Sequence, residues 1–288
     1  MSLRITEFPG WESEYRITGL IDGEKGKFIQ EYTGTPANRL ECHIKSIVRR
    51  ASGNERHCTD LLQAEKGWNL RQYPCFGMFW FLHFDLAESP IYDEILASVK
   101  DGAFLLDLGC GLGQGTRRLV YDGAPQANII GLDLSKEFID LGFELFNDQA
   151  SLRSTFLVQD FFEDSESLDR WAGGFNIINS GYFMHLWDWN GQLKVAKRMI
   201  SLFSLRGGNI VTGVNFGSEE TGRWAKAPAD LDGLFLHGCM TFRRLWEQVG
   251  RETQTRLSVW SAMERDEDHA RLDPKGLRLR WYVKLWGE

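Results

Sequence analysis

The chain has 288 residues, of which 43% are hydrophobic and 25% are charged, which are the fractions of an ordinary globular protein and not of a disordered one. A formal net charge of -7 supplies no overall field that would attract a phosphate backbone, so we expect no nucleic-acid partner. No apolar run reaches the roughly 18 residues of a membrane span, and no signal-peptide pattern opens the chain, so we expect a cytoplasmic protein with no membrane partner.

The cysteines are scattered, odd in number and free of any C-x-x-C pair, so we expect neither a disulfide framework nor a metal site. The length suits one catalytic domain with an N-terminal appendage. We therefore predict an extension with a lid over residues 1–88 and a catalytic domain over residues 89–288.

The first 30 residues of the extension have no clear period, and we interpret them as turns or a short hairpin. Thr35 and the helical spacing that follows predict a helix to about Ala51, and a second helical stretch lies at residues 59–68. The aromatic run "YPCFGMFWFLHF" at residues 73–84 predicts a lid or pocket wall, and a hydrophobic plug that docks the extension is the open alternative. Within that run we expect Tyr73 to contact a cofactor, and Phe79 and Phe81 to contact a substrate.

After a helix that runs through Ile95 to Val99, short apolar strands alternate with longer amphipathic helices. This order predicts an α/β fold with a doubly wound, mainly parallel, seven-stranded Rossmann-like sheet, whose ligands bind at the carboxyl ends of the strands. Only a loop is expected between the last two strands, so they should form an antiparallel hairpin. The strand candidates are 103–108, 127–133, 154–159, 174–179, 208–215, 255–262 and 278–286.

A glycine-rich turn follows the first strand in "FLLDLGCGLGQGTRRLV" at residues 104–120. Glycine lets the backbone turn tightly and approach a ligand, because no Cβ intervenes. Gln114 occupies the position where dinucleotide-binding proteins prefer Gly or Ala, and no P-loop Lys follows. The ligand-binding candidates in this turn are Asp107, Gly109, Cys110, Gly111 and Gly113.

Acidic residues end the next two predicted strands. Asp133 is suited to accept both hydroxyls of a ribose, and Asp160 to accept the exocyclic amine of adenine, with Leu134 or Phe161 flanking the ring. Capping of the following helices is the alternative role of both acids. Because S-adenosylmethionine has a ribose but no pyrophosphate, a G-x-G-x-G turn with a preceding acid suits it better than a nicotinamide cofactor.

The fourth predicted strand ends in N-S-G-Y, which places Asn179, Ser180, Gly181 and Tyr182 near the transferable methyl group. Enzymes that methylate nucleic-acid bases often carry N-P-P-Y here, so this sequence argues further against such a substrate. His185 is a candidate general base, with a hydrogen-bonded structural histidine as the alternative. Tyr182 and Trp187 are candidates to contact the acceptor.

Several segments resemble fungal natural-product methyltransferases, which include the carboxyl O-methyltransferases of meroterpenoid pathways. They are "YPCFGMFWFLHFDLAESPIYDEIL", "LLDLGCGLGQGTRRLVYDGAP", "NIIGLDLSKEFIDLGFELFND", "FMHLWDW" and "TFRRLWEQVGRETQT", over residues 73–255. The resemblance implies S-adenosylmethionine as cofactor, S-adenosylhomocysteine as product, and a small hydrophobic acid or phenol as acceptor.

The acceptor decides whether a base is needed. A carboxylate is already ionised at pH 7, whereas a phenol with a pKa of about 10 requires a base such as His185. Two other functions remain open. One is an S-adenosylmethionine-binding protein that catalyses isomerisation or cyclisation. The other is an NAD(P)-dependent reductase, which the sequence disfavours because Leu186 stands four residues after Tyr182, where a Tyr-x-x-x-Lys pair requires lysine. The sequence leaves the oligomeric state open, with a homodimer as one alternative.

Overall fold

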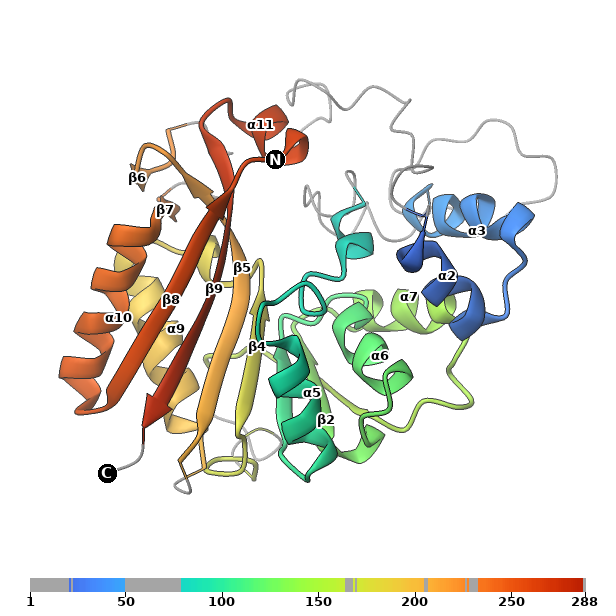
Figure 1. Cartoon of the computed structure of the whole chain (residues 1–288), viewed down its shortest axis with the longest axis horizontal. Helices are drawn as coiled ribbons and strands as arrows, with labels where there is room; N and C mark the ends of the chain where they lie inside the picture. Colours follow the sequence, from blue (N-terminus) through green and yellow to red (C-terminus); the bar gives the residue numbers. More distant parts are fainter. Residues whose placement is uncertain are drawn as a thin grey trace.

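The computed structural model describes residues 21, 23–49, 79–163, 168, 170–204, 207–225, 227 and 233–286. Within them, a seven-stranded sheet has the order β3-β2-β1-β4-β5-β9-β8 (Figure 1). The first five strands in that order are parallel, and β9 runs antiparallel to both β5 and β8. The strands are β1 (Leu105–Leu108), β2 (Ile129–Asp133), β3 (Thr155–Val158), β4 (Ile177–Gly181), β5 (Asn209–Ser218), β8 (Arg256–Glu264) and β9 (Gly276–Trp286). The predicted sheet and its antiparallel hairpin are confirmed.

Alternate strand residues enter two different cores because successive side chains of a strand point to opposite faces. Leu106, Ile178 and Val211 pack with helices α9 (Trp189–Ser201) and α10 (Cys239–Thr253). Leu105, Ile177 and Ile210 pack with α5 (Tyr92–Lys100) and α6 (Gln114–Tyr121). Helices on both faces leave the central strands almost fully buried, which explains their continuous apolar runs.

The order of the strands reverses between β1 and β4, which are neighbours in the sheet. The chain leaves β1 toward β2 and β3 on one side and returns to β4 and β5 on the other. The loops above the carboxyl ends of β1 and β4 therefore diverge and open a crevice, which is where ligands bind in such sheets.

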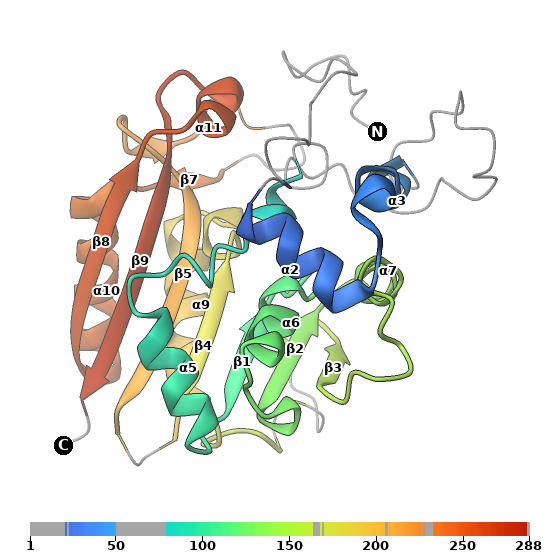
Figure 2. The same cartoon turned by 45° about the vertical axis from the view of Figure 1, so that its right-hand side comes forward.

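The N-terminal part adds two helices to this core, α2 (Glu24–Thr33) and α3 (Ala37–Arg49). Both pack on α7 (Lys136–Phe146), and Figure 2 shows α2 beside α6 and α7. Their apolar cluster continues through Phe81 and Leu82 of the 3-10 helix η2 (Trp80–His83) to Leu112 in the glycine turn. The helix predicted after Thr35 is confirmed as α3. The expectation of turns or a hairpin over the first 30 residues was wrong for residues 24–30, which belong to α2 and bury Phe28 and Ile29 against the core. The predictions for residues 1–20 and 59–68, and for Tyr73, fall outside the described residues.

The expectation of a loop alone between β8 and β9 was wrong, because helix α11 (Glu267–Leu272) lies there. Asp266 caps it by accepting the backbone N–H of His269 at 2.9 Å. A short strand pair, β6 (Gly222–Arg223) and β7 (Phe235–Leu236), was also unpredicted. The remaining 3-10 helices are η3 (Gln126–Asn128) and η4 (Met184–Leu186).

No helix in the described part of the chain is long and apolar enough to cross a membrane. In the same residues, no group of three or more His, Cys, Asp or Glu is arranged to hold a metal ion.

Candidate active site

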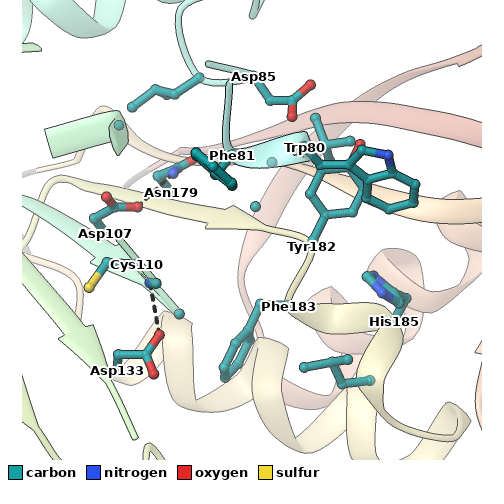
Figure 3. Close-up of a pocket in the computed structure, with 18 of the residues that line it drawn as sticks. Trp80, Phe81, Asp85, Asp107, Cys110, Asp133, Asn179, Tyr182, Phe183 and His185 are labelled. Carbon is teal, nitrogen blue, oxygen red and sulfur yellow. Dashed lines mark hydrogen bonds between the residues drawn. The ribbon is translucent and has the colours of Figure 1, made fainter. Parts of the chain in front are cut away.

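A cavity of about 460 Å³ opens at the carboxyl ends of the central strands (Figure 3). One end, which we call the glycine end, is lined by Asp107, residues 109–112, Gln114, Gly115, Asp133 and Asp160. The other, the aromatic end, is lined by Trp80, Tyr182, His185, Phe216, Trp224 and Arg280. Phe81 and Asn179 lie between the two ends in Figure 3.

The turn of the glycine end has left-handed backbone at three glycines, Gly109, Gly111 and Gly113, with φ of 66°, 54° and 64°. A Cβ on Gly109 would lie 2.6 Å from the ring of Phe183, but a Cβ on Gly111 would meet no atom within 4 Å. The space beside Gly111 is therefore open toward the cavity. Gly113 does not line the cavity and instead precedes the first residue of α6.

Asp133 fastens this turn to the end of β2. Its Oδ2 accepts the backbone N–H of Gly111 at 2.8 Å (Figure 3), and its Oδ1 accepts the N–H of Ser135 at 2.9 Å. Because an ionised carboxylate has about four lone-pair sites, these two bonds do not exhaust it. One carboxylate can thus shape the turn and still accept donors from a ligand.

Asp107 is 4% exposed and ties three elements together. It accepts the side-chain amide of Asn179 on β4 at 2.7 Å and the hydroxyl of Thr116 on α6 at 3.1 Å. Burial raises the pKa of this carboxyl, and the two hydrogen bonds oppose that rise. A Cβ on Gly115 would lie 3.3 Å from Asp107 Oδ2, a tight contact, so glycine at this position eases the close approach of α6 to the carboxylate.

The other predicted residues of this end divide into those that line the cavity and those that do not. Asp160 lines it and accepts the N–H of Phe162 at 2.8 Å, while Leu134 is 58% exposed at the rim. Phe161 lines it from the core, and Cys110 lines it with a thiol whose pKa is raised by burial. Ser180 does not line it, since strand alternation buries its hydroxyl on the opposite face.

Phe162 was missed by the sequence reasoning. It is 38% exposed and lines the cavity beside Asp160, and its ring packs edge-on against Trp187 at 5.6 Å. The adjacent pair "FF" directly after Asp160 was the available signal, since both rings follow a strand end that faces the ligand in such a sheet.

At the aromatic end, several rings stack around His269. Trp80 lies parallel to the imidazole at 4.5 Å, and Phe216 at 5.7 Å. Tyr182 donates its hydroxyl to His269 Nε2 at 3.3 Å, and His269 Nδ1 donates to Asp266 at 2.8 Å. Burial raises the pKa of Tyr182, which therefore stays protonated. Tyr182 itself has a left-handed φ of 51°.

Two arginines of β9 join this wall to the segment that follows η2. Arg280 is 5% exposed and donates to Glu264 at 3.0 Å, to the carbonyl of Asp85 at 3.0 Å and to Glu88 at 3.2 Å. Arg278 donates to His83 at 2.9 Å, and its Nη2 lies 3.3 Å from Asp266. These bonds hold Trp80 and Phe81 against the cavity. Phe79, by contrast, packs into the helical cluster and does not line the cavity.

His185 lines the cavity from η4, near Tyr182 (Figure 3). Its Nδ1 accepts the backbone N–H of Phe216 in a long hydrogen bond of 3.4 Å. Removal of the imidazole from water lowers its pKa to about 3, with His269 adding to the shift and Asn215 opposing it. The ring is therefore neutral at pH 7 and carries its proton on Nε2, as a hydrogen-bond donor.

Comparison with known proteins identifies relatives over most of the chain. A methyltransferase domain family matches residues 105–204. The O-methyltransferase phiE of a fungal species is 37% identical over 78% of this chain and 75% of its own length. The Asnovolin E/Chermesin D methyltransferase nvfJ of Aspergillus novofumigatus is 39% identical over 80% of this chain and 77% of its own length.

A solved structure supports the fold alone. It is a phosphoethanolamine N-methyltransferase of Haemonchus contortus with S-adenosylhomocysteine, 14% identical, with a TM-score of 0.50 over 76% of this chain and 59% of that chain.

Proposed function

Because this chain belongs to the fungal natural-product O-methyltransferases, which depend on S-adenosylmethionine, we propose that it methylates a carboxylate oxygen of a small hydrophobic acid. The observation that carries the choice of a carboxylate is the state of His185. A neutral imidazole whose Nδ1 already accepts a backbone N–H has no strong tendency to take a proton from a phenol.

The glycine end fits the cofactor. The side of Gly111 is open, and Gln114 Oε1 is buried without a hydrogen-bond partner in the described part of the chain. We assign Asp133 to the ribose hydroxyls and Asp160 to the adenine amine, with Leu134, Phe161 and Phe162 around the ring. Asp107, through Asn179 and Thr116, holds the turn in place for this ligand. When bound, S-adenosylmethionine supplies an electrophilic methyl group on a positively charged sulfur.

The aromatic end fits the acceptor. Trp80, Tyr182, Phe216 and Trp224 offer flat apolar walls, and Phe81 and Trp187 extend them toward the glycine end. These walls exclude water, which favours the reaction of an anion with a cation because the charges neutralise each other in the transition state. His185 donates its Nε2–H to the acceptor carboxylate and orients it, with no proton transfer.

Two variants of His185 test this assignment against panels of hydrophobic carboxylic acids and phenols. His185→Gln keeps a donor and should retain most methyl transfer to acids, whereas His185→Phe should lose roughly tenfold, the loss of about one hydrogen bond to a charged group. Activity with an acid should be flat between pH 6 and 8, where neither His185 nor the acid titrates.

A requirement for a base would give a different pattern. Both variants would then fail equally, phenols would be the better substrates, and the rate would rise with pH through the working range. That result would replace the carboxylate by a phenol as the acceptor.

A further inference from the structure

An arginine with no assigned part in the reaction donates hydrogen bonds to the glycine turn from the side that faces away from the cavity. We propose that Arg117 is a positioning residue for the cofactor turn and that Tyr32, acting through Asp148, makes helix α2 of the N-terminal extension part of the cofactor site. The inference rests on the proposed assignment of the glycine end to S-adenosylmethionine. It adds residues that do not line the cavity.

Arg117 is fully buried behind the turn. Its Nη1 donates to the carbonyl of Leu112 at 2.7 Å and to the carbonyl of Gly113 at 3.3 Å. The guanidinium also lies over the rings of Phe146 and Phe143, at 4.7 Å and 5.1 Å. It therefore fixes the direction of the carbonyls of Leu112 and Gly113, the two residues that follow Gly111.

The two sides of the turn are thus fastened by different groups. Asp133 holds the N–H of Gly111, and Arg117 holds the carbonyl of Leu112. A turn with three left-handed glycines has many accessible conformations in isolation, since glycine is the least restricted residue. Fixing it before the ligand arrives removes an ordering cost from binding.

Asp148 in turn fixes Arg117. It lies just beyond α7, is 4% exposed, and accepts Arg117 Nε at 2.7 Å and Nη2 at 2.9 Å in a two-point ion pair. This geometry leaves Nη1 directed at the turn. Removal of the Asp148 side chain would leave Arg117 as a buried cation without this counter-charge.

Tyr32 extends this chain of contacts to the N-terminal extension. Its hydroxyl donates to Asp148 Oδ2 at 2.9 Å, the same oxygen that accepts Arg117 Nε. Burial and the neighbouring carboxylate raise the pKa of Tyr32, so it stays a donor. The ring packs against Phe28 at 5.6 Å and Phe146 at 5.8 Å, so removal of the hydroxyl alone leaves the packing of α2 in place.

The chain contains a matched control on the next residue of the same helix. Arg118 pairs with Asp122 at 2.8 Å, and Tyr92 donates to Asp122 at 2.6 Å. This second Tyr–Asp–Arg group has the same chemistry, and burial likewise raises the pKa of its tyrosine. Its side chains bond to one another, and Arg118 also lies over the rings of Phe28 and Tyr121, none of which belongs to residues 109–113. The pair of groups therefore separates general stability from an effect on the turn.

The experiment compares Tyr32→Phe with Tyr92→Phe in the full chain by calorimetric titration with S-adenosylmethionine and by melting without ligand. Both variants lose one tyrosine hydrogen bond, so similar losses of melting temperature are expected. Tyr32→Phe should weaken cofactor binding roughly threefold to tenfold, the scale of one net hydrogen bond, and Tyr92→Phe should leave it unchanged. The KM for the cofactor should rise in the first variant, with kcat and the acceptor KM at parental values.

Parental cofactor affinity in a folded Tyr32→Phe protein would overturn the proposal and leave this group a structural ion pair. Equal weakening in both variants would also overturn it, because the effect would then reflect stability alone. Arg117→Lys should cause a larger loss, at least tenfold, since Lys cannot contact Asp148 and Leu112 in the same geometry. A parental chain that binds no S-adenosylmethionine would instead refute the proposed function of the glycine end.

Discussion

The two ends of the cavity are built in different ways. The glycine end comes mainly from residues 107–115, 133–134 and 159–162, which follow consecutive strands, and its ligand-facing features are backbone conformation and carboxylates. The aromatic end joins segments far apart in the chain, such as Asp85 and Arg280, which are 195 residues apart in sequence. The cofactor site is thus set largely by local turns, whereas the acceptor walls depend on contacts between distant segments.

If this division is correct, changes at one end should alter one binding constant and leave the other alone. The largest effect is expected for Gly111→Val. A branched side chain is strained at a φ of 54° and would project into the open space beside the turn, so cofactor affinity should fall roughly a hundredfold or more. Calorimetric titration measures the loss.

Gly208→Val is the control for strain, because Gly208 also has a positive φ, 71°, with no atom near its added Cβ. It should lower stability without changing cofactor affinity. Normal affinity in a folded Gly111→Val protein would remove the turn from the cofactor site.

Asp133→Ala should give the next largest effect. It removes the acceptor assigned to the ribose and also releases the N–H of Gly111, so cofactor affinity should fall by about 1.5–3 kcal/mol, the range for hydrogen bonds to a charged group. The acceptor KM should not change. Asp188→Ala removes a carboxylate that caps α9 outside the cavity lining and serves as the control. Equal effects of both variants on affinity would make Asp133 a cap as well.

The burial of His185 at the aromatic end should make the stability of the ligand-free protein depend on pH. The pKa of His185 is about 3 in the folded state, below its ordinary value of 6.5, so the unfolded chain binds an additional proton between those values. The free energy of unfolding should therefore fall with decreasing pH below 6.5, by up to about 1.4 kcal/mol per pH unit for one fully shifted group.

His237, which lies outside the cavity lining, has a similarly lowered pKa of about 3 and adds to the same slope, whereas the raised pKa of Asp107 opposes it. Urea unfolding at pH 5 and pH 6.5 measures the difference. In His185→Gln, the free energy of unfolding should depend less steeply on pH, because one of the two histidines that take up a proton on unfolding is gone. Identical slopes in the variant and the parent would show that His185 does not titrate in this window.

The smallest expected effect belongs to Tyr182→Phe. Loss of the hydroxyl removes its bond to His269, so the ring is held less firmly beside Trp80 and the acceptor KM should rise about twofold to tenfold. Cofactor affinity should stay at the parental value. Tyr282→Phe is the control, since that ring stacks on Trp260 away from the cavity; a weaker cofactor affinity in Tyr182→Phe would contradict the separation of the two ends.

The sequence by itself determined the sheet, the helices between its parallel strands and most of the glycine end. Strands and amphipathic helices are periodic, and the glycine turn, Asp133 and Asp160 follow strands whose carboxyl ends must meet at one edge of a parallel sheet. Each of these inferences depends on residues close together in the chain. Ser180 shows the limit even here, because motif proximity placed it at the site while strand alternation directs it elsewhere.

Only the tertiary structure decided the aromatic end and the support behind the turn. The stacking of Trp80 on His269 depends on how segment 79–89 packs against β9 and α11, and no local pattern encodes that packing. The same holds for Tyr32 and Asp148, which are 116 residues apart yet share one hydrogen bond. Nothing in the local sequence around these side chains distinguishes them. Their roles arise from contacts between distant segments, which neither composition nor periodicity predicts.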